Sequence, residues 1–471
     1  MANSSVLRSP AVDDARDRQV PGSFRDPAGF VFTRDGAVYR QVNVASRTAY
    51  DQLMQCGLYD DLTKAGLLIP HSEVPLAARS DPRAYRIIKP ERIAFVSYPY
   101  EWCFGQLKDA ALATLDIQRA AMARGMSLKD ASAYNIQFRG SQPVLIDTLS
   151  FEPLEDGRPW VAYRQFCQHF LAPLALMSTV DPRLGLIARA HIDGAPLDLA
   201  SRLLPIRTWL GGRLLLHVHL HALACRRFSG GTVKTRARRM TRAALLGLLD
   251  NLRAAIDRLS WSPDRSTWAA YDGETNYSTN ARKHKEDLVH QWLSGIGPST
   301  VWDLGCNAGR FSRIAAAIGA YTVAFDADYG AAELTYRACR TLRETHILPL
   351  VVDLANPSPA IGWAHAERSS WADRGPVDAV MALALVHHLV IGNNVPLSKV
   401  AQLLARIGNH LVIEFVPKSD SQVQRLLASR ADVFEDYTRA GFESAFADHF
   451  HTVRCAPIQE SERVLYLMRR R

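Results

Sequence analysis

Hydrophobic and polar positions in the second half of the chain alternate between short apolar runs and stretches with helical spacing. The apolar runs, rich in β-branched residues, predict five strands, at 300–302, 320–325, 347–352, 377–385 and 410–415. The spacing of residues 310–317 predicts a helix directly after the first strand. Strands that alternate with helices predict an α/β fold with a doubly wound, Rossmann-like sheet, whose ligand crevice lies along the carboxyl ends of the strands.

The first half has a different pattern, which predicts an α+β domain over residues 26–260 that is mostly helical after residue 160. Residues 1–25 are polar and predict a disordered tail. Residues 261–280 show little periodicity and predict a linker or a lid, so that the doubly wound domain covers 281–471. Within the first domain we expect these elements: a strand at 38–42, helices at 48–65 and 106–124, and a hairpin of 136–138 with 144–146.

The turn between the first predicted strand and helix reads D-L-G-C-N-A-G-R, with glycines at Gly305 and Gly309. Glycine suits a sharp bend that a ligand must approach closely. The spacing differs from the G-x-G-x-x-G fingerprint of dinucleotide sites, and the carboxylate of Asp303 would repel a pyrophosphate. A ligand with positive charge, such as S-adenosylmethionine, fits better; the alternative is a bare turn without a ligand.

A second acid supports a nucleoside ligand. Asp326 ends the second strand, 23 residues after Asp303, near the interval at which an acid reaches the ribose hydroxyls of a bound nucleoside. Asp353 ends the third strand in the same way. Because the carboxyl ends of parallel strands meet at one edge, we expect the three acids to share one crevice.

Four ordered motifs, V-W-D-L-G-C-N-A-G-R-F, T-V-A-F-D-A-D, V-V-D-L and L-A-L-V-H-H-L, resemble those of class I S-adenosylmethionine-dependent methyltransferases over about residues 275–471. The resemblance implies that Asp303, Gly305 and Gly309 line the methionine moiety, and Asn307 of the first motif belongs to the same cofactor set. It further implies that Asp326 binds the ribose and Asp353 the adenine amino group.

Methyl transfer from a sulfonium to a hydroxyl needs alignment and is helped by a base. His387 and His388 follow the fourth strand, and a histidine can accept a proton at neutral pH. Aligning L-V-H-H-L with the I-L-H-D-W pattern that it resembles in small-molecule O-methyltransferases places the base at His387; the alternative is a histidine packed at a strand end. Five residues border the same edge and are candidates for substrate binding: Arg310, Asn393, Asn394, Glu414 and Lys418.

The segment L-K-D-A-S-A-Y-N-I-Q-F in the first domain resembles the catalytic loop of protein-kinase-like and aminoglycoside-phosphotransferase-like folds. That resemblance implies a nucleotide and magnesium site with Asp130, Asn135 and Asp147, and hence Mg-ATP as a second cofactor. The sequence departs from those families because Lys129 precedes Asp130 and residues 26–100 contain no glycine-rich loop. A kinase-like phosphotransferase or an ATP-binding regulatory protein is therefore the alternative function; in the remaining alternative Asp130 only caps a turn.

Composition limits the partners. The net charge of +9 is moderate for 471 residues, so we do not expect nucleic-acid binding. The seven cysteines are scattered, which indicates a reducing, cytoplasmic location without a zinc site. Arg207 and Arg213 interrupt the apolar stretch 203–224, so no membrane span is expected.

Two local runs of polar residues have structural interpretations. His217, His219 and His221 predict a packed row of histidines rather than a metal site. The basic run 234–242 predicts the solvated start of a helix.

Segments such as S-Y-P-Y-E-W-C-F and I-E-F-V-P-K extend the resemblance to most of the chain. They resemble a bacterial family of large two-domain methyltransferases related to the host-specific nodulation methyltransferases of rhizobia, which act on the fucose of lipochitooligosaccharide signals. The resemblance implies O-methylation of a glycan, glycolipid or other small-molecule hydroxyl. A non-catalytic binding protein with the same fold is a further alternative, and the oligomeric state stays open.

Overall fold

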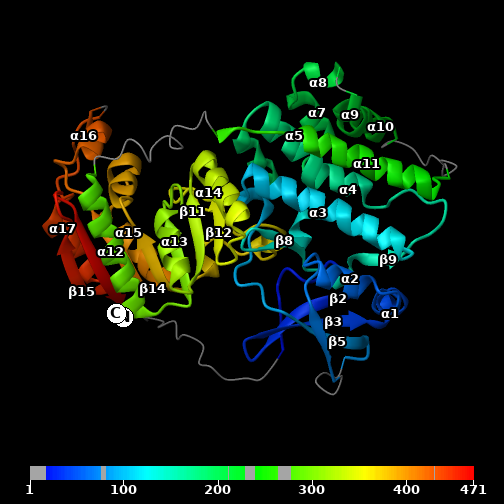
Figure 1. The fold of residues 1–471 in the computed structure, drawn as a ribbon, viewed down its shortest axis with the longest axis horizontal. Helices are drawn as coiled ribbons and strands as arrows, with labels where there is room; N and C mark the ends of the chain where they lie inside the picture. The colour runs from blue at the N-terminus through cyan, green and yellow to red at the C-terminus, as the bar shows by residue number, and fades with distance from the viewer. Residues whose placement is uncertain (1–16, 76–80, 211, 229–238, 264–276, 429) are drawn as a thin grey trace, which may run out of the picture.

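The computed structural model describes residues 17–75, 81–210, 212–228, 239–263, 277–428 and 430–471. Figure 1 shows two parts side by side, a C-terminal sheet with helices on both faces and an N-terminal part of helices and a small sheet. Most of the predicted tail, linker and basic run lies outside the described residues. Arg18–Gln19, at the end of the predicted tail, forms strand β1 and pairs with a neighbouring strand.

The C-terminal sheet has seven strands in the order β12-β11-β10-β13-β14-β16-β15. The first five are parallel, and β16 runs antiparallel between β14 and β15. The strands are β10 Thr300–Leu304, β11 Tyr321–Asp326, β12 Ile347–Val351, β13 Val377–Ala382, β14 Gly408–Phe415, β15 Phe450–Pro457 and β16 Val464–Arg470. The helices are α12 Thr279–Ile296, α13 Arg310–Ala317, α14 Tyr329–Leu342, α15 Leu397–Ile407, α16 Ser421–Leu427 and α17 Arg439–Ala447. The predicted doubly wound sheet is thus present.

The N-terminal part is α+β, as predicted, with an antiparallel sheet in the order β1-β2-β3-β5-β4. Its strands are β2 Gly29–Arg34, β3 Ala37–Asn43, β4 His71–Val74 and β5 Ala84–Pro90. Two further antiparallel pairs join β6 Met126–Leu128 with β9 Phe151–Pro153 and, as a hairpin, β7 Ile136–Arg139 with β8 Gln142–Leu145. Its helices are α1 Arg47–Gln55, α2 Leu58–Lys64, α3 Phe104–Ala123, α4 Tyr163–Phe166, α5 Ala172–Thr179, α6 Ile187–Ala190, α7 Leu197–Leu203, α8 Arg207–Leu210, α9 Gly212–Leu214, α10 His221–Phe228 and α11 Arg242–Arg258. A kinase-like architecture stays a prediction.

Two predicted elements differ from the structure by an internal break or by more than two residues at an end. The helix expected at 48–65 is broken into α1 and α2 at Gly57, whose φ of +83° is left-handed. The fourth strand of the C-terminal sheet ends at Ala382 rather than at residue 385, because the backbone turns at Ala384 with φ +50°. This turn carries residues 383–385 away from the sheet.

Aromatic side chains join the two parts into one core. Phe95 of the N-terminal part packs edge-on against Trp302 of β10 and Phe325 of β11, with ring centroids 5.7 and 6.0 Å apart. Trp371 closes the cluster at 5.1 Å from Trp302. All four rings belong to one continuous cluster of buried residues that spans both parts. The N-terminal part therefore supports two adjacent parallel strands of the C-terminal sheet, β10 and β11.

A buried ion pair lies at the same junction. Arg374 donates to both carboxylate oxygens of Glu101, whose side chain is fully buried, and to the carbonyl oxygen of Val96. Glu101 also accepts from the backbone N–H of Tyr98. Removing one partner of such a pair leaves an uncompensated buried charge, which is strongly destabilising.

We expect Arg374→Met to lower the free energy of unfolding by about 3–5 kcal/mol, because Glu101 stays buried without its cation. The Lys283–Asp287 pair is exposed, so Lys283→Met should cost less than about 1 kcal/mol. Urea unfolding followed by tryptophan fluorescence measures both values. Similar small losses in the two variants would contradict a structural role for the Glu101–Arg374 pair.

Candidate active site

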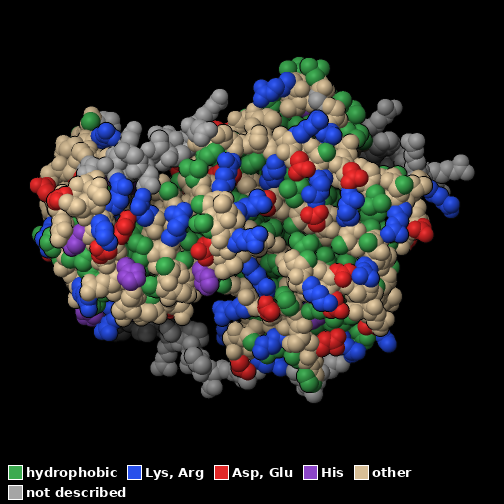
Figure 2. Space-filling view, in the orientation of Figure 1, with side chains coloured by type: hydrophobic (Ala, Val, Ile, Leu, Met, Phe, Trp, Pro, Cys, Tyr) green, Lys and Arg blue, Asp and Glu red, His purple; other side chains and the backbone are tan. Residues whose placement is uncertain are grey.

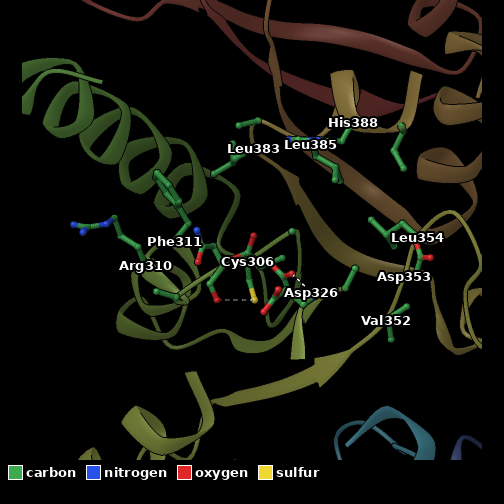
Figure 3. Close-up of a pocket in the computed structure, with 18 of the residues that line it drawn as sticks. Cys306, Arg310, Phe311, Asp326, Val352, Asp353, Leu354, Leu383, Leu385 and His388 are labelled. Carbon is green, nitrogen blue, oxygen red and sulfur yellow. Dashed lines mark hydrogen bonds between the residues drawn. The ribbon is translucent and has the colours of Figure 1, made fainter. Parts of the chain in front are cut away.

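A cavity of about 430 Å³ opens at the carboxyl ends of the parallel strands. Its walls come from the segments that follow β10, β11, β12 and β13, together with α12 and the loop before β16. In the view of Figure 3, Cys306 and Asp326 lie at its centre and His388, Leu383 and Leu385 above them. Arg310 and Phe311 lie at one end, and residues 352–354 lie at the other. The cavity occupies the crevice that the strand pattern predicts.

The turn after β10 has the backbone geometry that its glycines suggest. Gly305, Asn307 and Gly309 have φ values of +73°, +47° and +72°. Asparagine tolerates this left-handed region better than most residues. Gly305 and Asn307 line the cavity, whereas Gly309 does not. A Cβ at Gly309 would approach Thr335 of α14 to 2.8 Å, so this glycine serves the packing of the turn against that helix.

Asp303 and Asp326 line the cavity from adjacent strands. Asp303 accepts a hydrogen bond from the Ser312 hydroxyl at 2.6 Å. Asp326 accepts from the backbone N–H groups of Asn307 and Asp328, each at 2.8 Å. Burial raises the pKa of both carboxyls to about 6, and the charge of Asp326 contributes to the shift of Asp303. A cation placed in the cavity would therefore stabilise the charged form of each carboxyl.

The far end of the cavity combines an exposed carboxylate with apolar side chains. Asp353 follows β12, and one of its oxygens accepts from the backbone N–H of Ala355. The apolar lining here and on the facing wall consists of Val352, Leu354, Leu383, Leu385 and Leu389. A flat aromatic base with a polar edge suits such a slot, because its faces need apolar contact and its edge needs an acceptor.

Sequence reasoning missed a charged network beside the cavity, and the charge of its Lys285 acts on Asp303. Glu414 is fully buried and accepts from Lys285 Nζ at 2.6 Å, from Arg463 at 3.3 Å and from the hydroxyl of Tyr277. Burial alone would raise the pKa of Glu414, but the two cations outweigh it and lower the pKa to about 2. Tyr277, Lys285 and Arg463 line the cavity, whereas Glu414 does not.

The histidine pair splits at the cavity wall. His388 lines the cavity and is partly exposed, while His387 is 1% exposed and is not among the lining residues. Burial lowers the pKa of His387 to about 3 and also lowers that of His388. Both imidazoles are therefore neutral at pH 7. Only His388 faces the space where an acceptor could lie.

The residues expected to border the substrate are divided as well. Arg310 and Asn393 line the cavity. Asn394, Glu414 and Lys418 do not, and Lys418 instead pairs with Asp432 at 2.8 Å. Of the five candidates, Arg310 and Asn393 therefore remain possible contacts of a ligand in the cavity.

The kinase-like segment uses its side chains for internal contacts. Asp130 accepts from the Gln165 amide and from the backbone N–H of Ser132, which caps the turn. Asp147 caps the turn before β9 and pairs with Arg40 of β3 at 2.9 Å. The Asn135 amide donates to Ser150 at 3.3 Å. Mg-ATP at this place stays a prediction.

The histidine row is packed, as the sequence indicated. His217 contacts the hydroxyl of Tyr163 and the amide oxygen of Asn251, at 2.7 and 2.8 Å. His219 is bonded to two hydroxyls, and His221 stacks on Tyr163. Within the part of the chain that the structure describes, no group of three or more His, Cys, Asp or Glu side chains is arranged to hold a metal ion.

Comparison with solved structures finds similarity to methyltransferases, at low identity. Magnesium protoporphyrin IX methyltransferase from Synechocystis PCC 6803 is 17% identical, with 43% of this chain and 93% of that chain covered and a TM-score of 0.32. The N-methyltransferase NodS from Bradyrhizobium japonicum WM9 is 15% identical over 41% of this chain and 98% of that chain, with a TM-score of 0.31. The bifunctional kinase-methyltransferase WbdD is 18% identical over 42% of this chain and 41% of that chain, with a TM-score of 0.29.

Sequence comparison gives a full-length relative. No model of a known protein family matches the chain. Nodulation protein NoeA of Rhizobium meliloti (strain 1021) is 36% identical over 464 residues, which cover 97% of each chain. The predicted relation to rhizobial nodulation proteins is confirmed by this relative. The chain belongs to the family of nodulation protein NoeA.

Proposed function

We propose that the protein is an S-adenosylmethionine-dependent methyltransferase that acts on a hydroxyl group. The observation that carries this proposal is the pair Asp303 and Asp326, two buried carboxyls with raised pKa values at the ends of adjacent strands, in one cavity with a glycine turn. Two charged carboxyls buried side by side are energetically unfavourable without a cation. The ammonium and sulfonium charges of the donor would stabilise them. A dinucleotide would bring phosphates to the same carboxylates, which would repel them.

The lining residues fit each portion of this donor. The Asp303 end would hold the cationic methionine portion, Asp326 would accept from the ribose hydroxyls, and the slot beside Asp353 would take the adenine. When bound, the donor supplies an activated methyl group. The cavity's residues would hold it in line with the acceptor and exclude water, and alignment is the main requirement of this displacement.

His388 would act as the base in this proposal. A neutral imidazole in the cavity wall can accept the hydroxyl proton as the oxygen attacks. The low pKa of His388 keeps the ring unprotonated at pH 7. The resemblance to methyltransferases of rhizobial nodulation signals supports a saccharide hydroxyl, on a glycan or glycolipid, as the acceptor. NoeA is named as a nodulation protein, which fits such an acceptor.

We expect Asp326→Asn to weaken S-adenosylmethionine binding by about 10- to 100-fold, because the ribose hydroxyls lose a charged acceptor. Isothermal calorimetry with the full chain measures the affinity. Asp287→Asn is the matched control, since Asp287 is exposed on α12 and does not line the cavity. Equal affinities of the two variants would remove Asp326 from the cofactor site.

The affinity for S-adenosylmethionine should also fall as the pH drops from 7.5 to about 5. Asp303 and Asp326 have raised pKa values of about 6, so they lose their negative charge through this interval. Binding of the cation near pH 6 should release protons, because it favours the charged carboxylates. Calorimetry in buffers of different ionisation enthalpy measures this release. A pH-independent affinity without proton release would contradict the proposed cation site.

We expect His388→Asn to lower turnover by about 10²- to 10⁴-fold and to leave donor affinity nearly unchanged, because the base is lost but the cofactor site is not. His387→Asn should retain most activity, since His387 does not line the cavity. The assay follows tritiated methyl groups from the donor into glycan and glycolipid extracts. If only the His387 variant lost turnover, the base would be His387, the residue that the alignment with the O-methyltransferase motif indicates.

A further inference from the structure

The helices from α7 to α10 carry an exposed apolar face on the N-terminal part. Ile206 and Leu210 are 85% and 89% exposed, far above what a buried contact would leave. Figure 2 shows hydrophobic side chains gathered over α8 and its neighbours, beside Lys and Arg side chains. Six aliphatic residues make up this face, which we name the α7–α10 face: Leu203, Ile206, Leu210, Leu216, Leu220 and Leu223.

Buried polar contacts hold the α7–α10 face in place from below. His219, which is fully buried, is bonded to Ser201 of α7 at 2.8 Å and to Thr208 of α8 at 2.9 Å. Its ring stacks on Trp209 at 4.2 Å. One imidazole thus ties three segments together and fixes the direction in which Ile206 and Leu210 point. The exposure of Ile206 and Leu210 is therefore fixed by the packing of these helices.

Charge around the α7–α10 face is predominantly positive. Asp198 of α7 is an acid at this place, and it pairs with Arg226 at 3.6 Å and with Arg202 at 3.9 Å. The chain contains 56 Lys and Arg and 47 Asp and Glu. Residues 199–249 contain ten of the basic residues and no acidic one, so the remaining 46 basic residues are nearly balanced by the 47 acids. The net positive charge of the protein therefore resides in this one segment. Among the described residues, the basic members beside the apolar face are Arg202, Arg207, Arg213 and Arg226.

We infer that the α7–α10 face docks on an anionic lipid bilayer. Aliphatic side chains would enter the interfacial region while the arginines contact lipid phosphates, which is the combination that peripheral attachment requires. A second copy of the face would bring together two surfaces with an excess of positive charge, despite Asp198 on α7, and a nucleic acid would offer no apolar partner to Ile206 and Leu210. No helix among the described residues is long and apolar enough to span a membrane. The inference is independent of methyl transfer.

The test is co-sedimentation of the full chain with unilamellar vesicles of phosphatidylcholine alone or mixed equally with phosphatidylglycerol. We expect binding only to the mixed vesicles, and weaker binding as salt is raised. The double variant Ile206→Asp/Leu210→Asp should reduce partitioning at least tenfold, because two apolar anchors become charged. Leu342→Asp is the matched control, since Leu342 is 67% exposed on α14, outside the basic segment.

Thermal unfolding of each variant shows whether the fold is kept, and the salt and lipid dependence of the unaltered protein tests the proposal without any variant. Equal binding to both vesicle types, or no binding to either, would overturn it. The proposal would also be overturned if the double variant and the control variant bound mixed vesicles as strongly as the unaltered protein does. Undiminished binding of the double variant to DNA, without vesicle binding, would assign the charge to nucleic acid. A dimer that Ile206→Asp/Leu210→Asp dissociates would assign the face to self-association.

Discussion

The contact of Phe95 with Trp302 and Phe325 is the constraint on which the rest of the structure depends. These two rings directly precede Asp303 and Asp326, the acids at the ends of β10 and β11. Because side chains alternate along a strand, a ring locked on one face fixes the direction of the acid that follows it. The N-terminal part, through Phe95 and the Glu101–Arg374 pair, thereby sets the geometry of a cavity that the C-terminal sheet provides.

This coupling explains why two destabilising carboxyls persist. Asp303 and Asp326 form no ion pair among the described residues, and burial raises their pKa values to about 6, although the charge of Lys285 opposes the shift of Asp303. Glu414, which does not line the cavity, has two cations, and its pKa lies near 2. The chain thus pairs Glu414, which holds Tyr277 and Lys285, with two cations. Among the described residues it forms no ion pair with Asp303 or Asp326, the acids that would meet a cationic ligand. The pKa values thus distinguish a paired acid outside the cavity from the two acids that line it.

Much of the C-terminal part could be predicted from the sequence because its signals are local. Helix α13 occupies the predicted residues, since apolar spacing and the glycine turn determine both of its ends. The last two strands were not predicted, and Arg463 between them was missed with them. Lys285 was missed because its partner Glu414 lies 129 residues away, and no local pattern reports such a pairing. Likewise, two adjacent histidines look equivalent in sequence, and only the turn at Ala384 shows that His388 alone faces the cavity.

The charge of the chain is also divided between places with different tasks. The cavity wall combines acids with Lys285 and Arg463 at close range, so its field is local and short in reach. Residues 199–249 carry the net charge without an acid, and such a field extends over about a Debye length, roughly 10 Å at 0.1 M salt. A local field selects a small ligand, whereas an extended one attracts a surface. No residue of the α7–α10 face lines the cavity, so variants of the face and variants of the cavity can be studied separately.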